Sequence, residues 1–515
     1  MIFMRKDRVR SPNNPSKIRG FFERIGRIFF GEYVSMKVLI TGATGLIGRA
    51  TMLRLLSEGG HELTAVSRDP SRAANQLGAE VHIVGWDQED ELVSALDGCD
   101  LVLHLAGAPV ADRRWTKAIR HVIWESRVGT TKRLIQSIGR CRQVPKVLIQ
   151  ASAVGIYGGE GRPVEETSEL GEGFLAELGR AWEAAGAAAS EFGTRVIAAR
   201  FGVVLAHYGA FETMARVYHW RCGARIGSGR QGMPWVHLDD AVEMLLWAYN
   251  TPAVTGPLNV VSPAPLTQGQ FHNALVRHVG AQWSPPIPAS VLRWVLGARA
   301  ELITEGAFVT PKKACDLGYK HRFATLADAL TSLMRPLSHE QLSIEYTQTP
   351  EIRAGKKSQY VLKAETIVPS SIDEVAPWFE TPANLTLMTP PFMAFEIQTE
   401  EPMGVDAEIS YRIRLFGVPM RWTSRIPVFE PGVRFVDTQV RGPYRLWWHE
   451  HRFSAVDGGT RILDIVHYRV PVPVLGRLAN RLWVGPTLLR IFGFRYHTMT
   501  QRFASPATQT LRNSA

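Results

Sequence analysis

Three glycines with the spacing of a phosphate-binding loop follow the first apolar run of the chain. Gly42, Gly45 and Gly48 lie in the stretch TGATGLIG, between the apolar residues 37–41 and an apolar-periodic helix through Leu56. The first glycine permits a tight turn, the second lets the backbone approach a pyrophosphate, and the third allows close packing of helix on strand. In this context the motif predicts a dinucleotide site at the positive end of the helix dipole. The expected contacts are Gly42, Thr44, Gly45, Leu46, Ile47 and Gly48.

The end of the second apolar run indicates which dinucleotide to expect. An acidic residue there would hold the ribose 2′-hydroxyl of NAD, but the chain reads Val66-Ser67-Arg68-Asp69. The planar guanidinium group of Arg68 can bind a 2′-phosphate, and Ser67 can donate a hydrogen bond to the same phosphate. Asp69 competes with this interpretation but lies one position further along. The sequence therefore predicts NADP in preference to NAD.

In the part of the sequence that must hold this loop, short apolar runs alternate with helical stretches. Such a pattern predicts an α/β fold of the Rossmann type, a doubly wound parallel sheet that is covered by helices on both faces. The apolar runs are 37–41, 62–66, 81–84, 101–106, 146–152 and 195–200.

After residue 359 apolar and polar residues alternate, which is typical of antiparallel strands with one wet face. A long apolar helix over about 474–501 follows these strands. A curved antiparallel sheet wrapped against one helix leaves a cavity between them, so a second, α+β domain with a ligand cavity is expected. The expected strands are 407–416, 433–440, 444–453 and 460–470.

A chain of 515 residues exceeds what one hydrophobic core usually supports, so at least two domains are expected. Residues 1–35 carry +5 of the net charge of +11 and have no core pattern. They are either a tail outside the fold or a segment, disordered or helical, that associates weakly with an anionic surface. The expected divisions are 1–35 as this extension, 36–335 as the NADP-binding domain with a C-terminal extension over about 285–335, 336–357 as a polar linker, 358–505 as the second domain, and 506–515 as a tail.

The first domain resembles the atypical or extended short-chain dehydrogenase/reductases, in particular their NAD(P)-dependent epimerase-like subgroup with a short C-terminal extension. The resemblance is carried by TGATGLIG, HLAGAPV (104–110) and GSGRQGMPWVHLDDAVEMLLWA (227–248), and by PKKACDLGYKHRFATLADAL (311–330) for the extension. It implies that Leu105, Ala106 and Gly107 pack under the ribose and nicotinamide of the cofactor. It also places Ser152 at the family's serine position.

Residues 358–505 resemble the SRPBCC or START-like superfamily of helix-grip domains, through VPSSIDEVAPWFETPANLTLMTPP (368–391) and GPYRLWWHEHRF (442–453). This resemblance implies a cavity that takes an apolar ligand.

The catalytic pair that the first family uses is missing from its expected helix. That family places Tyr-x-x-x-Lys there, and the lysine lowers the pKa of the tyrosine for proton exchange. The two possible registers put Phe174 and Leu178, or Leu178 and Trp182, at these positions. Ser152 and Tyr157 remain as candidate catalytic residues. A lone tyrosine titrates near 10 and is a poor base at neutral pH, so Tyr157 is equally well interpreted as a pocket wall.

Two further residues are candidates for contact with a small-molecule substrate. Arg230 and His237 lie in the segment that resembles the substrate-binding part of sugar-nucleotide epimerases. Arg230 can bind an anionic group. His237 can equally be a structural residue that caps the following helix.

Charge, hydrophobicity and cysteine content exclude several classes of function. The basic excess outside residues 1–35 forms no dense run, which argues against nucleic-acid binding, and no apolar stretch is long enough to span a membrane. The four scattered cysteines fit a reducing cytoplasm and predict neither disulfides nor a metal site. Two functions stay open: an NADP-dependent oxidoreductase or epimerase-like enzyme of unknown substrate, and a non-catalytic NADP-binding sensor.

Overall fold

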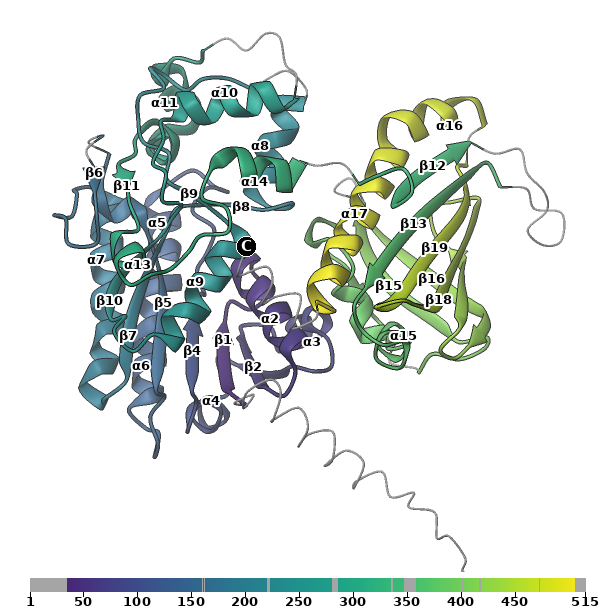
Figure 1. The fold of residues 1–515 in the computed structure, drawn as a ribbon, viewed down its shortest axis with the longest axis horizontal. Helices are drawn as coiled ribbons and strands as arrows, with labels where there is room; N and C mark the ends of the chain where they lie inside the picture. The colour runs from purple at the N-terminus through teal and green to yellow at the C-terminus, as the bar shows by residue number, and fades with distance from the viewer. Residues whose placement is uncertain are drawn as a thin grey trace, which may run out of the picture.

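The computed structural model describes residues 35–504 except 160, 162, 220–222, 280–285, 335–336, 347–357, 400–401, 416–417 and 472. These residues form an N-terminal α/β unit and a C-terminal antiparallel unit that lie against each other (Figure 1). The expected extension up to residue 34, most of the expected linker and the tail at 506–515 lie outside the described residues.

The N-terminal unit is built on a parallel sheet in the order β10-β7-β5-β4-β1-β2-β3. All six strands predicted from the apolar runs are present, so the Rossmann-like sheet is confirmed. The seventh, β10, was not predicted because it begins Gly-Pro and has a thin apolar pattern. The strand bounds are β1 (Lys37–Thr41), β2 (Glu62–Ser67), β3 (His82–Gly85), β4 (Leu101–His104), β5 (Val147–Ala153), β7 (Arg195–Phe201) and β10 (Gly256–Val260).

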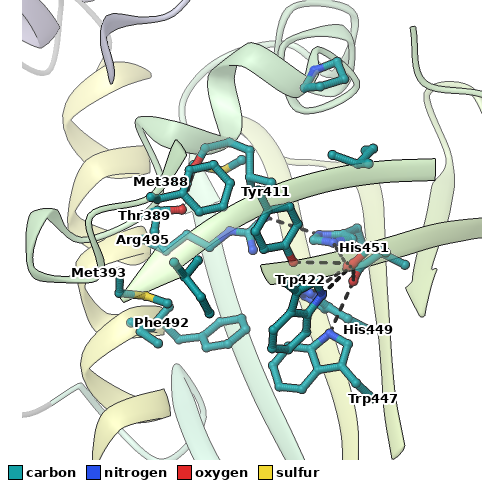
Figure 2. Close-up of a pocket in the computed structure, with 18 of the residues that line it drawn as sticks. Met388, Thr389, Met393, Tyr411, Trp422, Trp447, His449, His451, Phe492 and Arg495 are labelled. Carbon is teal, nitrogen blue, oxygen red and sulfur yellow. Dashed lines mark hydrogen bonds and ion pairs between the residues drawn. The ribbon is translucent and has the colours of Figure 1, made fainter. Parts of the chain in front are cut away.

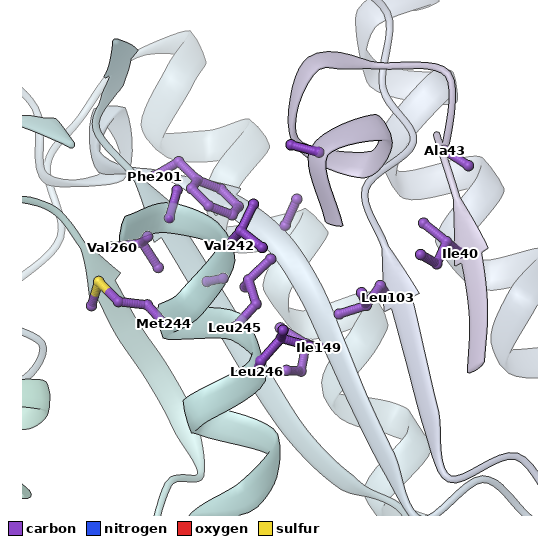
Figure 3. Packing of buried hydrophobic residues seen from close by; sticks show 14 of the residues in the cluster. Ile40, Ala43, Leu103, Ile149, Phe201, Val242, Met244, Leu245, Leu246 and Val260 are labelled. Carbon is purple, nitrogen blue, oxygen red and sulfur yellow. The ribbon is translucent and has the colours of Figure 1, made fainter. Parts of the chain in front are cut away.

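Helices cover both faces of this sheet because alternate side chains of its strands point to opposite sides. Ile40, Leu103 and Ile149 pack with α9 (Leu238–Asn250) on one face (Figure 3). The neighbouring residues Leu39, Val102 and Leu148 pack on the other face. The helices there are α4 (Glu89–Leu96) and α6 (Thr130–Ile138). The other elements of this unit are α2 (Leu46–Glu58), α3 (Pro70–Leu77), α5 (Lys117–Trp124), η1 (Glu125–Gly129), η2 (Val154–Tyr157), β6 (Pro163–Val164), α7 (Phe174–Ala187), η3 (Ala188–Phe192), β8 (Val203–Leu205), α8 (Ala210–His219), β9 (Trp235–His237), α10 (Gln268–Val279), α11 (Ala289–Leu296), η4 (Gly297–Ala300), α12 (Glu301–Thr304), β11 (Phe308–Val309), α13 (Lys312–Asp316) and α14 (Leu326–Met334).

The C-terminal unit is an eight-stranded antiparallel sheet in the order β12-β13-β19-β18-β17-β16-β15-β14. A helical stretch packs along it: α16 (Pro473–Ala479), a π-helical turn η7 (Asn480–Val484) and α17 (Gly485–Arg502). The antiparallel strands and the long helix predicted from the sequence are confirmed. The remaining bounds are β12 (Leu342–Tyr346), β13 (Tyr360–Val368), α15 (Ile372–Phe379), η5 (Pro382–Thr386), η6 (Pro391–Met393), β14 (Glu396–Ile397), β15 (Glu408–Leu415), β16 (Val418–Glu430), β17 (Arg434–Arg441), β18 (Leu446–Val456) and β19 (Gly459–Arg469).

The prediction of a polar linker over 336–357 is wrong for one segment. Residues 342–346, which have a polar pattern, form the edge strand β12 and pair with β13. An edge strand is held by backbone hydrogen bonds along one side and needs only a few apolar contacts. Leu342 and Ile344 supply these contacts by packing against the core of the C-terminal unit.

The two units share a packed interface in which α17 lies against α2 (Figure 1). Leu53 of α2 is buried in the same cluster as Trp378 and Phe503 of the C-terminal unit. The Arg502 guanidinium lies 2.9 Å from the Glu80 carboxylate across the interface. Among the described residues, no helix combines the length and the apolar character that crossing a membrane requires.

Candidate functional site

A groove of about 220 Å³ lies at the carboxyl ends of β1, β2 and β4, where ligands bind in open α/β sheets. Leu46, Ile47 and Gly48, the other predicted contacts, belong to the first turn of α2 rather than to the lining. The predicted cofactor residues that line the groove are Gly42, Thr44, Gly45, Ser67, Arg68, Leu105, Ala106 and Gly107.

The glycine loop is held by contacts that leave no room for side chains. Gly42 has a φ of +72°, and a Cβ on it would lie 2.7 Å from the carbonyl carbon of Leu105. A Cβ on Gly48 would lie 2.4 Å from the carbonyl oxygen of Gly42. Gly45 is the N-cap of α2 and no side chain caps this end. Free N–H groups at the start of a helix are the donors that a diphosphate needs.

The residues at the end of β2 and just after it place a basic side chain at the groove and direct the acidic one elsewhere. Asp69, the competing acid, caps α3 by accepting a hydrogen bond from the backbone N–H of Arg72 at 3.0 Å. Arg68 is exposed at the rim of the groove. The Ser67 hydroxyl donates to the Asp69 carbonyl at 3.0 Å. Arg68 is therefore a basic side chain at the rim of the groove, and its contact with the 2′-phosphate stays a prediction.

A buried histidine fixes the loop after β4. His104 lies between the hydroxyls of Thr41, at 2.7 Å, and Thr131, at 2.9 Å. Burial lowers the pKa of His104 to about 4, so the ring is neutral at physiological pH. The Thr41 hydroxyl also accepts from the backbone N–H of Ala106 at 3.2 Å. This chain of hydrogen bonds positions Leu105–Gly107 against the groove.

Sequence reasoning missed the other wall of the groove, which comes from a π-helical turn. Ser126 and Thr130 line the groove from η1 and the start of α6. Arg127 donates to the carbonyl of Ala108 at 3.0 Å and lies over the ring of Trp182. A π-helical turn is rare and frequently marks a functional site, but no residue pattern in this segment predicts it.

Ser152 and Tyr157 lie in a buried polar network. The Ser152 hydroxyl donates to the Glu183 carboxylate at 2.6 Å. Arg200 donates to Glu183 at 2.8 and 2.7 Å and to the Tyr157 hydroxyl at 2.8 Å. Tyr157 in turn donates to Asn259 at 2.7 Å. Both hydroxyl protons are therefore committed to protein acceptors.

The environment of these two hydroxyls disfavours proton transfer to a substrate. Burial raises the pKa of Tyr157, although Arg200 and Asn259 act in the opposite direction. Along β5, Ser152 points into the protein and the next residue, Ala153, is exposed. The outward position at the end of this strand thus carries no hydroxyl. Sequence reasoning missed Glu183 and Arg200 because they are distant in sequence from Ser152.

The helix expected to carry a tyrosine and a lysine is α7, and it has neither residue. Leu178 and Trp182 are buried in the core, and Phe174 packs edge-on against Trp115. The Tyr-x-x-x-Lys pair is therefore missing from every register of α7.

The two proposed substrate contacts differ in environment. Arg230 is exposed on the loop before β9, so its contact with an anion stays a prediction. His237 is buried, accepts from the backbone N–H of Asp239 at 3.1 Å and stacks on Phe323. Its place as the N-cap of α9 favours the structural role over substrate contact.

A second cavity, of about 150 Å³, lies between the C-terminal sheet and α17 (Figure 2). Its walls are mostly apolar and aromatic, and they include Trp422, Trp447 and Phe492. Polar side chains from the middle of the sheet form one wall, and Arg495 of α17 faces them. Such a cavity is a candidate site for a small ligand.

Comparison with known proteins identifies the N-terminal unit. The NAD dependent epimerase/dehydratase family model matches residues 38–261, and a domain of unknown function, DUF1731, matches residues 287–333. Epimerase family protein YfhF of Bacillus subtilis is 33% identical over 302 residues, 58% of this chain and 98% of YfhF. The chain belongs to this epimerase family.

Other members of the epimerase family support the same assignment. Epimerase family protein MT2273 of Mycobacterium tuberculosis is 35% identical over 57% of this chain and 96% of its own length. The crystal structure of human epimerase family protein SDR39U1 with NADPH is 32% identical, with a TM-score of 0.52, and covers 58% of this chain and 99% of that one. The resemblance to the epimerase-like subgroup is thus confirmed. Both family models end before the C-terminal sheet.

Proposed function

We propose that this chain binds NADP(H) in the groove beside β1 and uses it on a small-molecule substrate. The cradle of Gly42, Gly45 and Gly48 supports this proposal most strongly, because added Cβ atoms at Gly42 and Gly48 would collide with backbone. The human relative was solved with NADPH. NADP(H), when bound, donates or accepts a hydride. The residues of this chain bind its diphosphate at the start of α2 and its 2′-phosphate at Arg68.

Arg68→Ala is expected to weaken NADPH binding by about 10–100-fold and to leave NADH binding almost unchanged. A charge-assisted hydrogen bond to phosphate contributes about 1.5–3 kcal/mol, and NADH lacks this phosphate. Calorimetry with both cofactors measures the effect. Arg72→Ala, in the next helix and outside the groove lining, is the matched control. Equal losses for both cofactors, or no loss, would contradict the role of Arg68.

The second candidate function is the non-catalytic NADP-binding sensor. It is favoured by the buried network, in which Glu183 and Asn259 accept the hydroxyl protons of Ser152 and Tyr157. An assay of NADPH oxidation over a panel of carbonyl compounds separates the two functions. Turnover above that of a cofactor-binding variant supports an enzyme, and its absence across the panel supports the sensor.

For the C-terminal unit we propose a helix-grip domain of the SRPBCC or START-like kind that holds an apolar ligand. Its antiparallel sheet, the helix α17 and the apolar cavity between them support this proposal. A cavity of about 150 Å³ with mostly apolar walls is large enough for a benzene-sized molecule. The ligand is therefore expected to be a small apolar molecule, or one that enters after side chains of the wall move.

Ile413→Phe is expected to fill the cavity and to reduce binding of toluene at least tenfold, because the larger side chain takes the volume of the ligand. Ile413 is buried and lines the cavity on β15. Ile367→Phe is the matched control, since Ile367 is 56% exposed on β13. Quenching of the tryptophans at the wall reports binding. Equal toluene binding in both variants would contradict an apolar ligand site here.

A further inference from the structure

A cluster of two histidines and two aspartates from three neighbouring strands lies at the polar wall of the C-terminal cavity. His449 and His451 lie on β18, Asp437 on β17 and Asp464 on β19. His449, His451 and Asp464 are almost fully buried, with exposures of 5%, 3% and 4%. Figure 2 shows the two imidazoles together at the end of the cavity that Trp422 and Trp447 border. This cluster has no part in the cofactor groove.

We propose that His449, His451 and Asp437 bind a divalent first-row transition metal with an open position toward the apolar cavity. Asp437 Oδ2 lies 3.0 Å from His449 Nδ1 and 3.3 Å from His451 Nε2. Two ligands that are each about 2.1 Å from one metal ion lie about 3.0–3.4 Å apart at octahedral or tetrahedral angles. One donor atom from each of the three residues lies within 4.8 Å of the other two.

Asp464 would not bind the metal itself but would orient both histidines by accepting hydrogen bonds from their other ring nitrogens. Its Oδ1 lies 3.2 Å from His449 Nε2 and 2.7 Å from His451 Nδ1, the ring nitrogens opposite those that face Asp437. Metal-binding histidines usually donate their second N–H to such a carboxylate. Arg495 lies 3.5 Å from Asp464 and 3.3 Å from His451 Nδ1. Asp464 does not line the cavity, whereas the three proposed ligands do.

The two oxygens of Asp437 have different partners, and only Oδ2 faces the histidines. Its Oδ1 accepts from the Ser424 hydroxyl at 3.2 Å and from the indole N–H of Trp447 at 3.3 Å. Its Oδ2 faces the two imidazoles, whose ring centroids are 3.8 Å apart. When both imidazoles are neutral, each has a single N–H, so each ring turns one lone pair toward a carboxylate oxygen. A metal ion between Asp437 and the two neutral rings would accept the lone pairs that face it.

The charges around the site define the class of ligand that completes the coordination. With neutral histidines, Asp437, Asp464 and Arg495 sum to −1, and a divalent ion changes this to +1. An anionic oxygen in the open position neutralises the cavity. The expected ligand is therefore a small apolar molecule with an acidic oxygen, or a hydroxide ion. Two imidazoles and one carboxylate suit zinc or iron(II) better than magnesium or calcium.

The test uses the tag-free full chain, stripped with a chelator and dialysed against Zn²⁺. We expect one Zn²⁺ per chain. His449→Gln and His451→Gln each lower Zn²⁺ affinity at least 100-fold, while Asp464→Asn lowers it about 10–100-fold and keeps the stoichiometry. The matched control is His467→Gln, because His467 lies on the adjacent strand β19 and outside the cavity lining.

X-ray absorption of the wild-type chain loaded with Zn²⁺ keeps the proposal falsifiable if the variants misfold. The expected spectrum has nitrogen and oxygen neighbours, with scattering from two imidazoles. Sulfur at about 2.3 Å would assign the ion to a cysteine and overturn the proposal. A wild-type chain that retains no Zn²⁺, or unchanged affinity in a folded His449→Gln/His451→Gln double variant, would overturn it as well. None of these results depends on NADPH binding.

Discussion

Gly48→Ala is expected to lower NADPH affinity by roughly 100-fold while the rest of the chain stays folded. The new Cβ would lie 2.4 Å from the Gly42 carbonyl oxygen and 2.8 Å from the Cα of Ala43, and both atoms belong to backbone. Relief requires that the loop move away from the start of α2. Overpacking of this kind costs about 1–3 kcal/mol. A displaced loop also loses the aligned N–H groups that hold the diphosphate.

The control for this variant is Gly493→Ala, which also places alanine inside a helix. A Cβ on Gly493 in α17 meets nothing within 4 Å. That variant is expected to keep NADPH affinity and to gain about 0.5–1 kcal/mol of stability from helix propensity. Calorimetry with NADPH and thermal unfolding distinguish the two variants. Wild-type affinity in Gly48→Ala would mean that the diphosphate binds elsewhere.

Arg200→Ala is expected to lower the free energy of unfolding of the N-terminal unit by about 3–5 kcal/mol, because it leaves a charge without its partner inside the protein. The side chain of Arg200 is 3% exposed and that of Glu183 is 14% exposed. Removal of the guanidinium also takes a hydrogen-bond donor from Tyr157. Chemical denaturation measures this loss.

Two further variants separate a buried ion pair from a general effect of losing an arginine. Arg425→Ala breaks an exposed pair with Glu408 and is expected to leave the free energy of unfolding almost unchanged. The double variant Arg200→Met/Glu183→Gln removes both charges and should recover most of the lost stability. A cost below about 1 kcal/mol for Arg200→Ala, or no recovery in the double variant, would refute the structural role of this network.

The phosphate loop and the strands of the first sheet were predictable because they depend on local sequence. A glycine that must adopt a positive φ, an apolar run buried on both faces and a helix that starts after the turn are each visible within about ten residues. Gly42, Gly48 and Arg68 follow from such short segments. The strand β12 was not predicted, because backbone pairing with β13 compensates for its weak apolar pattern.

The roles of Ser152 and Tyr157 depended on residues that the sequence does not place beside them. Their sequence positions suggested chemistry, whereas the contacts with Glu183, Arg200 and Asn259 commit both hydroxyls to a buried network. Successive side chains of β5 also point to opposite faces of the sheet, so that Ala153 is exposed and Ser152 is buried. Side-chain direction at the end of a strand depends on its register, which tertiary packing fixes.

The sequence by itself determined that the first part of this chain is an NADP-type Rossmann fold and that an antiparallel sheet with a long helix follows. Tertiary structure alone decided that Asp437, His449, His451 and Asp464 meet. His449 and His451 share a face of β18 because side chains alternate with a period of two. The two aspartates join them through the pairing of β17 and β19 with that strand. Cross-strand pairing brings together residues whose separation in sequence carries no signal, and so the strand register determined this site.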